Sequence, residues 1–392
     1  MAPLWSYQPF KLIYTLYFAP TTVLYLAVLA VRYSFRPLRP LKEWSYFTSL
    51  GAAVLRYTFQ FMAAIRYQRP PQMTAGRSKE RFALIQPPSD KEGSAFFTGA
   101  LAPKIVNPAP VGVVWHPTPL TAPDVTTAGS EPSRKKVAIM FAGGALVLGW
   151  DPEGTGQTAS DVLTRYFGAT NIVYVQYRLA TRETPFPAGV QDALTTYCYV
   201  LSLGVAPEDI TMVGDSAGGN IAIAFCRYVE TNATHIPRPG AVVVFSPWVD
   251  VTLGAGDRYD QTAGSQFDII DGNLLEWGVT AYRPTLDKVR LVCNSDVEAD
   301  TFLREAEPFI SPLNHPFRTK TPFFIQAGEV EGLFDSISRF AQQMANVKGN
   351  RVHFEVSEHM PHDCFLPYPV LGTRKAVQAA LTTARRFFDE VA

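Results

Sequence analysis

The sequence predicts an α/β fold with a mostly parallel central sheet and helices on both faces. From about residue 82 onwards, short apolar runs alternate with segments of helical periodicity. Several runs are apolar almost throughout, such as AVVVFSP at 241–247 and PFFIQAG at 322–328, which is typical of strands covered on both faces. A glycine-rich turn at 214–218 leads from one such run into a helical pattern. This alternation favours parallel pairing through βαβ units.

The elements follow in order along the chain. Strands are predicted at 111–115, 135–141, 171–177, 210–213, 241–247, 322–328 and 352–358, and helices at 189–203, 333–347 and 377–391. The acidic and glycine-rich segment from about 250 to 310 interrupts this alternation, and we predict that it is an insertion over the functional site. We therefore expect an N-terminal region over 1–70 and a main domain over 71–392 that carries this cap.

The N-terminal region contains a segment, Leu12–Val31, that is uncharged over its whole length and long enough to cross a bilayer as a helix. Lys11 precedes it, and a group of basic residues follows it: Arg32, Arg36, Arg39 and Lys42. A single membrane anchor is the favoured interpretation. A cleaved signal peptide is an alternative, since small residues at 28–30 offer a cleavage point. The third interpretation is a hairpin or interfacial helix formed together with the next apolar stretch of the chain.

That next stretch, 46–65, is largely apolar with helical spacing but contains Arg56. It is expected to lie in the membrane interface or to pack over the main domain as a cap. The basic residues after the anchor favour a cytosolic main domain. The sequon at Asn232, which is used only on the lumenal side, favours the opposite orientation.

Composition excludes several classes of function. Basic and acidic residues balance at 35 each, with no basic block, so nucleic acid is not an expected partner. The four cysteines are widely spaced without a CxxC pair, which favours neither a zinc site nor a disulfide framework. There is no HExxH motif, and we expect no metal or organic cofactor. The oligomeric state is not predictable from these features.

The turn GDSAG identifies Ser216 as the candidate nucleophile. A strand leads into Gly214 and a helix leads out, so the serine sits at a sharp strand-to-helix turn where its hydroxyl projects above the sheet edge. Gly214 and Gly218 suit a turn too tight for a side chain. The N–H of Ala217 would then point at an oxyanion from a helix N-terminus. The alternative is a structural turn that happens to contain a serine.

A nucleophilic serine also needs further donors and a base. The loop FAGGAL after the strand at 135–141 offers the backbone amides of Gly143, Gly144 and Ala145 as oxyanion donors. The loop SEHMPHDCF after the last strand offers His359 and His362. We favour His362 as the base, because it lies further into the loop and can reach over the sheet edge.

The acid should follow the preceding strand, where QAGEVEGLFDS offers three candidates. Glu331 is favoured over Glu329 and Asp335, because it lies in the middle of the loop and is followed by Gly332, where the chain can turn toward the histidine. The chain order Ser216, Glu331, His362 is that of an α/β-hydrolase triad.

These motifs resemble those of the hormone-sensitive-lipase-like branch of the α/β-hydrolases, in particular the arylacetamide-deacetylase and fungal steryl-acetyl-hydrolase types, over roughly residues 110–390. The matching segments are GDSAGGN (214–220), YRLATRETPFPAGVQDAL (177–194), FSPWVDVT (245–252), GEVEGLFD (328–335) and MPHDCF (360–365). The resemblance supports Glu331, since a glutamate replaces the aspartate in the fungal members. It also implies a membrane-bound esterase on the endoplasmic reticulum or another endomembrane.

The oxyanion loop departs from the pattern of that family. Where the family has HGGG, this chain has Ala142-Gly143-Gly144-Ala145, and the donors of the family fall on Gly144 and Ala145. The missing histidine would brace the loop, and Ala145 adds a methyl group where the backbone approaches the substrate. We therefore expect a weakened or re-shaped oxyanion hole.

The predicted activity is that of a membrane-anchored serine carboxylesterase or deacetylase. It would hydrolyse a short-chain, acetyl-like ester of a bulky apolar alcohol or specialised metabolite through Ser216, His362 and Glu331. Two alternatives follow from the altered loop: an acyltransferase or other non-hydrolytic enzyme of specialised metabolism, or a pseudo-enzyme that only binds.

Overall fold

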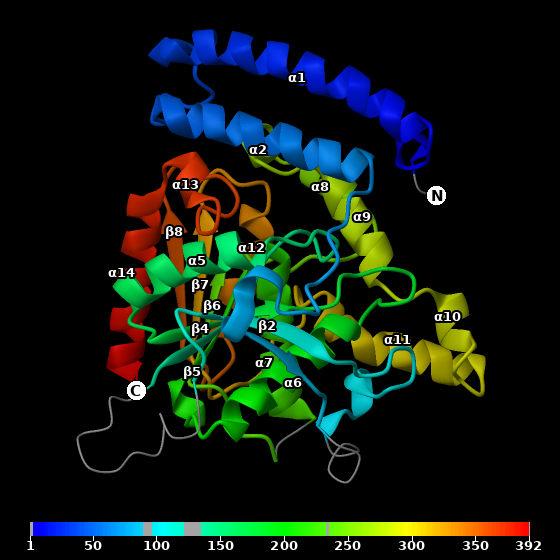
Figure 1. Ribbon diagram of the computed structural model, residues 1–392. Helices are drawn as coiled ribbons and strands as arrows, with labels where there is room; N and C mark the ends of the chain where they lie inside the picture. Colours follow the sequence, from blue (N-terminus) through cyan, green and yellow to red (C-terminus); the bar gives the residue numbers. More distant parts are fainter. Residues whose placement is uncertain (1–2, 89–95, 121–134, 233–234, 392) are drawn as a thin grey trace.

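The computed structural model describes residues 3–88, 96–120, 135–232 and 235–391. Its centre is a sheet whose described strands run in the order β1-β2-β4-β3-β5-β6-β7-β8 (Figure 1). The strands are β1 (Phe82–Ile85), β2 (Val111–His116), β3 (Val137–Phe141), β4 (Asn171–Gln176), β5 (Ile210–Asp215), β6 (Ala241–Phe245), β7 (Phe323–Gly328) and β8 (Val352–Ser357). Pairing is parallel from β4 to β8, and antiparallel where β2 meets β1 and β4. The predicted α/β fold with a mostly parallel sheet is confirmed.

Helices cover both faces of the sheet. The main helices are α1 (Phe10–Ser34), α2 (Tyr46–Ala64), α5 (Pro152–Val162), α6 (Ala188–Ser202), α7 (Ser216–Thr231), α8 (Ala255–Asp260), α9 (Gly272–Tyr282), α10 (Leu286–Arg290), α11 (Asp296–Ile310), α12 (Phe334–Ala345), α13 (Tyr368–Leu371) and α14 (Arg374–Val391). Residues of α6, α7 and α12 share one apolar core with one face of the sheet. Residues of α5 and α14 share a second core with the other face.

The strand β1 and the helix α5 are among the elements that the sequence did not predict. The strand β1 is a short edge strand, so its four residues carry little periodicity. The helix α5 contains two glycines, which weaken a helical signal. It is started instead by Asp151, whose side chain accepts a hydrogen bond from the N–H of Gly154.

Two groups of helices lie over the carboxyl edge of the parallel strands, where ligands bind in open α/β sheets. The helices α8 to α11 occupy the segment predicted as an insertion, 250–310. The helix α2 packs against α9 and α13, and α1 lies outside α2 as the outermost layer (Figure 1). Within the described residues, α1 is the one helix long and apolar enough to cross a membrane. The sequon at 232–234 falls partly outside the described residues.

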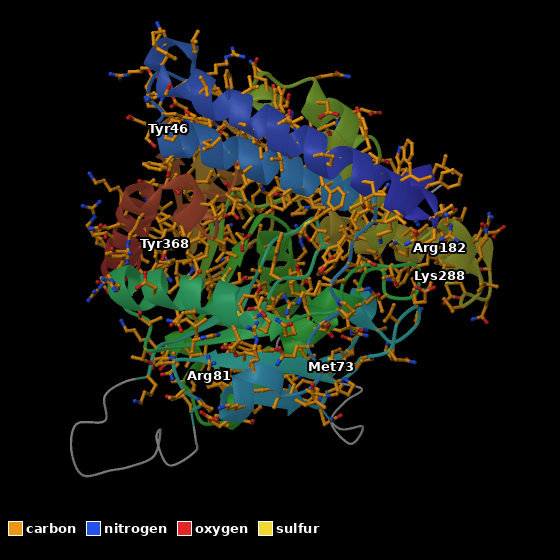
Figure 2. All side chains as sticks on the ribbon, turned by 45° about the horizontal axis from the view of Figure 1, so that its top comes forward. Tyr46, Met73, Arg81, Arg182, Lys288 and Tyr368 are labelled. Atoms are coloured by element: carbon orange, nitrogen blue, oxygen red, sulfur yellow. The ribbon has the colours of Figure 1, made fainter. Side chains whose placement is uncertain are left out.

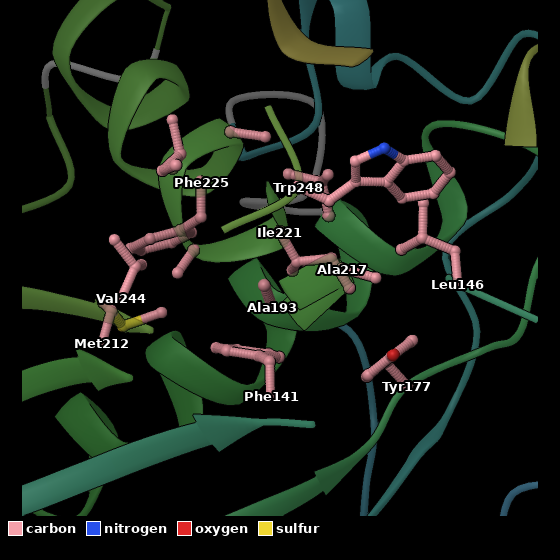
Figure 3. Packing of buried hydrophobic residues seen from close by; sticks show 14 of the residues in the cluster. Phe141, Leu146, Tyr177, Ala193, Met212, Ala217, Ile221, Phe225, Val244 and Trp248 are labelled. Carbon is pink, nitrogen blue, oxygen red and sulfur yellow. The ribbon is translucent and has the colours of Figure 1, made fainter. Parts of the chain in front are cut away.

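The core behind the glycine-rich turn is densely packed. Phe141 of β3, Ala217 and Ile221 of α7, and Trp248 after β6 gather around it and are all fully buried (Figure 3). The backbones approach so closely that a Cβ on Gly218 would lie 1.9 Å from the carbonyl oxygen of Phe141. This core therefore fixes the position of the turn relative to the sheet.

Candidate active site

The turn between β5 and α7 holds Ser216 in a strained conformation. Its φ is +49°, in the left-handed region that few non-glycine residues adopt. A Cβ on Gly214 would lie 2.4 Å from the backbone carbon of Gly218, so the tight turn does require glycine. The strain and the crowding match the predicted turn, and they aim the serine hydroxyl away from the sheet edge.

Three of the predicted site residues meet in one hydrogen-bonded chain. The Nε2 atom of His362 lies 2.9 Å from Oγ of Ser216, and its Nδ1 atom lies 2.7 Å from Oε2 of Glu331. The other carboxylate oxygen of Glu331 accepts a hydrogen bond of 2.9 Å from the N–H of Gly328. All three side chains are buried. The geometry is that of a nucleophile, a base and a carboxylate that orients the base.

The candidates that the sequence ranked lower lie elsewhere. Glu329 and His359 form their own pair at the surface, with 3.2 Å between Oε2 and Nδ1. Asp335 is exposed in the first turn of α12. The same two loops thus present one buried and one exposed acid–histidine pair.

The buried pair changes the proton affinity of both partners. Burial by itself would lower the pKa of His362, but the hydrogen bond and charge of Glu331, aided by Asp268 and Asp363, outweigh it and raise the pKa to about 9. Burial raises the pKa of Glu331, and the hydrogen bond from His362 opposes this. The carboxylate therefore stabilises the imidazolium that forms when the serine loses its proton.

The predicted oxyanion donors separate into two groups. The N–H of Gly143 is donated to Oδ2 of Asp215 at 2.9 Å, so its assignment as an oxyanion donor is wrong: the amide is already engaged. Gly144 and Ala145 line the same cavity as Ser216, and Ala217 follows the serine at the first turn of α7. Among the described residues, no hydrogen bond occupies the N–H groups of these three.

The loop is braced without the missing histidine. The hydroxyl of Tyr177 donates a hydrogen bond of 2.6 Å to the carbonyl of Ala142. The indole N–H of Trp150 donates one of 2.9 Å to the carbonyl of Gly143. Ala145 has a φ of +51°, a conformation that an alanine keeps only where its surroundings impose it. The expected weakening through lost bracing is therefore offset by two aromatic side chains.

Sequence reasoning missed a residue that joins the two catalytic loops. Asp268, in the cap, accepts the backbone N–H of His362 on Oδ1 at 2.7 Å and that of Gly332 on Oδ2 at 2.8 Å. The hydroxyl of Tyr259 adds a third hydrogen bond at 2.8 Å. No motif marks this aspartate, and only the fold brings it to the loops.

A pair of buried carboxyl groups lies behind the nucleophile. Asp215 and Asp363 are both buried, and their carboxyl groups interact electrostatically. Burial, with the charge of Asp363 second, raises the pKa of Asp215 well above its ordinary value, and burial likewise raises that of Asp363. The backbone N–H groups of Phe365 and Leu366 donate to Oδ1 of Asp363.

Ser216 and His362 line a cavity of about 280 Å³. Apart from the catalytic end, its wall is mostly apolar: Leu55, Phe59, Trp150, Ile269, Ile270, Leu274, Leu275, Leu366, Pro367 and Val370. Such a cavity selects apolar ligands and leaves the few polar groups to orient them.

Comparisons with known proteins agree with the fold. A family model described as alpha/beta hydrolase fold matches residues 139–366. An acetyl-hydrolase of Streptomyces hygroscopicus is 29% identical over 269 residues, which cover 66% of this chain and 80% of that protein. The human arylacetamide deacetylase-like 2 is 32% identical over 129 residues, 31% of each chain.

Solved structures share the fold. An esterase from the bacterial hormone-sensitive lipase family superposes with a TM-score of 0.55 and 21% identity, over 93% of this chain and 98% of the other. The protein belongs to the α/β-hydrolases, and its relatives agree with the predicted resemblance to their hormone-sensitive-lipase-like branch. Relatives with names such as esterase and acetyl-hydrolase agree with the predicted class of ester hydrolase.

Proposed function

We propose that this protein is a membrane-associated serine carboxylesterase or deacetylase that hydrolyses short-chain esters of bulky apolar alcohols. The observation that carries the proposal is the hydrogen-bonded chain from Ser216 through His362 to Glu331 at the end of an apolar cavity. A nucleophile, a base and an orienting acid in contact supply what acyl transfer through a covalent intermediate needs.

The first half of the reaction forms an acyl-enzyme. Oγ of Ser216 attacks the ester carbonyl while Nε2 of His362 takes the hydroxyl proton, and Glu331 stabilises the resulting cation. The N–H groups of Gly144, Ala145 and Ala217 bind the oxyanion of the tetrahedral intermediate. The intermediate collapses as the imidazolium gives its proton to the leaving alcohol.

The second half of the reaction releases the acid. Water enters the place of the alcohol and attacks the acyl-enzyme, and His362 accepts one of its protons. The second tetrahedral intermediate collapses, and the proton returns to Oγ of Ser216. The protein needs no group beyond these residues for either half of the reaction.

The cavity wall supports an apolar substrate. Ten apolar residues line it, and its volume leaves room for a group much larger than an acetyl chain. The acetyl-hydrolase among the relatives supports a short acyl group. We assign the acyl group to the catalytic end and the alcohol to the apolar remainder.

Membrane association is proposed on the properties of α1. Only 6% of the most apolar 18-residue stretch of α1 is buried against the rest of the protein, although the helix is long enough to span a bilayer. A helix with this much apolar surface in water favours association with lipid.

The test is hydrolysis of 4-nitrophenyl esters of increasing chain length by the full-length protein in detergent. We expect turnover that is highest for acetate and butyrate and that Ser216→Ala abolishes. Labelling with a fluorophosphonate, read against Ser216→Ala, reports an activated serine independently of the ester. A wild type that neither labels nor turns over would be a binding protein instead. One that labels and yields transesterified product in preference to acid when an acceptor alcohol is added would be an acyltransferase.

A further inference from the structure

The helix α2 is part of the catalytic site, although it comes from the N-terminal region. Leu55 and Phe59, on its inner face, line the cavity that contains Ser216. Between them, Arg56 donates hydrogen bonds of 2.6 and 2.9 Å to the carbonyls of Ser265 and Asp268 in the cap. The second of these partners is the aspartate that holds the histidine and acid loops.

Two further contacts fix α2 on the catalytic domain. The indole N–H of Trp44, just before the helix, donates to the carbonyl of His359 in the histidine loop at 2.5 Å. Gly51 packs so closely on α13 that a Cβ there would lie 2.3 Å from the carbonyl oxygen of Val370. The position of α2 is therefore set by the loops that carry the chemistry.

The helix α1 lies lengthwise on the outer face of α2. Aromatic rings meet at successive points along both helices: the centroids of Phe18 and Phe61 lie 5.2 Å apart, and those of Tyr25 and Tyr57 lie 5.3 Å apart. Figure 2, in which the outer layer faces the viewer, shows the two helices crossing the molecule side by side. The inner face of α1 thus contacts α2 at several points along the helix.

The outer face of α1 is apolar and uncovered. Leu16, Leu24 and Val31 are 67%, 69% and 67% exposed. Exposed basic residues, Arg32 and Arg36 among them, stand at the C-terminal end of this face. A single apolar face with cations beside it complements a bilayer with anionic headgroups.

We propose that α1 lies along the surface of a lipid bilayer and does not cross it, so that α2 separates the lipid from the catalytic cavity. If α1 stood upright while packed on α2, the charged surface of the catalytic domain beneath α2 would enter the hydrocarbon, which is strongly unfavourable. The second part of the inference rests on the proposed esterase function. A cavity walled by this membrane-facing layer receives lipophilic esters that partition into the bilayer.

The first experiment measures the depth of α1 in phosphatidylcholine vesicles that contain phosphatidylserine. Nitroxide labels are attached to Leu12→Cys, Val23→Cys or Val31→Cys in the full-length protein, with the half-buried Cys198 and Cys293 replaced by serine. A helix along the surface places all three labels at one shallow depth. A spanning helix places the middle label deeper than the first by roughly 16 Å, from a rise of 1.5 Å per residue. That gradient, or labels that stay in water, overturns the proposal.

The second experiment tests delivery of the substrate. The double variant Leu16→Glu/Leu24→Glu is compared with wild type and with Leu291→Glu. Leu291 is a leucine of the cap that is even more exposed, at 86%. We expect the double variant to bind vesicles about a hundredfold more weakly, through the lost burial of two leucines. Its turnover of a long-chain ester carried in the vesicles should fall with binding, while turnover of soluble 4-nitrophenyl acetate stays at the wild-type level.

The outcomes separate the two proposals. If the double variant still hydrolyses the vesicle-borne ester at the wild-type rate, the proposal that substrate is delivered from the bilayer is overturned. A wild type that hydrolyses neither ester overturns the esterase function, and the depth measurement still decides how α1 lies. Equal losses in the double variant and in Leu291→Glu would show an effect of added charge alone and would also overturn delivery.

Discussion

Replacing Glu331 with glutamine should nearly abolish catalysis without changing the shape of the site. The carboxylate has two engaged oxygens: one faces Nδ1 of His362 at 2.7 Å and the other accepts the N–H of Gly328 at 2.9 Å. A glutamine has only one acceptor. If the oxygen of the glutamine keeps the hydrogen bond from the N–H of Gly328, its NH₂ group faces Nδ1 of His362. The imidazole then carries its proton on Nε2, and Nε2 can no longer accept the proton of Ser216.

The opposite orientation of the amide is no better. It restores the contact with Nδ1 but sets two donors, the NH₂ group and the N–H of Gly328, against each other in a buried position, at a cost of about 1–3 kcal/mol. We therefore expect kcat to fall by about 10⁴, the size of effect that a wrong imidazole tautomer has in such triads. This corresponds to about 5 kcal/mol of transition-state stabilisation.

The pH dependence should shift at the same time. In the wild type, kcat/KM should rise with pH as His362 loses its proton, around the pKa of about 9 that Glu331 helps to maintain. Without the negative charge that raises this pKa, burial prevails, and the rise should move to lower pH. The variant should thus lower both kcat and the pH midpoint of kcat/KM. The first falls through the wrong imidazole tautomer and the second through the lost negative charge.

The assay is kcat/KM for 4-nitrophenyl acetate across pH, with Glu329→Gln as the control. Glu329 lies two residues away in the same loop and pairs with the exposed His359, so its substitution should leave both the rate and the midpoint nearly unchanged. A loss smaller than about tenfold in Glu331→Gln, or a midpoint that stays in place, would refute the role assigned to this glutamate.

Three further substitutions test the surroundings of the site. Gly143→Ala places a Cβ 2.5 Å from Oδ2 of Asp215, so it should destabilise the fold by about 1–3 kcal/mol and lower kcat. The control is Gly154→Ala, whose Cβ would lie 3.5 Å from its nearest neighbouring atom. It should change neither the free energy of unfolding nor kcat in the same denaturation and rate measurements. Asp363→Asn should retain activity at neutral pH, because its amide can donate to Asp215. Burial raises the pKa of Asp363, so its protonated form adds stability at low pH, and this stability is lost as the pH rises through the raised value. Over that pH range, Tm should therefore decline more in the wild type than in the variant. Asn220→Ala should lower stability by about 2–5 kcal/mol in urea unfolding, because two buried carbonyls lose the donors they share; an unchanged midpoint would contradict this.

The local features of the site were predictable because each depends on residues close together in the chain. The strained turn at Ser216 follows from the glycines on either side of it. The buried strands follow from uninterrupted apolar runs. The ranking of Glu331 above Glu329 followed from its place before Gly332, and the structure joins it to His362.

The supporting contacts were not predictable, because they join segments that are far apart in sequence. Asp268 reaches the histidine loop across 94 residues, and Arg56 reaches Asp268 across 212. Gly143 was wrongly included among the oxyanion donors because only the folded chain brings the carboxylate of Asp215 to its N–H.

The sequence by itself determined the class of fold and the turn that holds Ser216, and it predicted the order of the three residues that the structure joins, since short-range periodicity and turn chemistry specify them. The tertiary structure decided which amides stay free, how the altered oxyanion loop is braced, and that an N-terminal helix walls the cavity through Leu55 and Phe59. These depend on packing between distant elements, where the free energy comes from contacts that no local pattern of residues encodes.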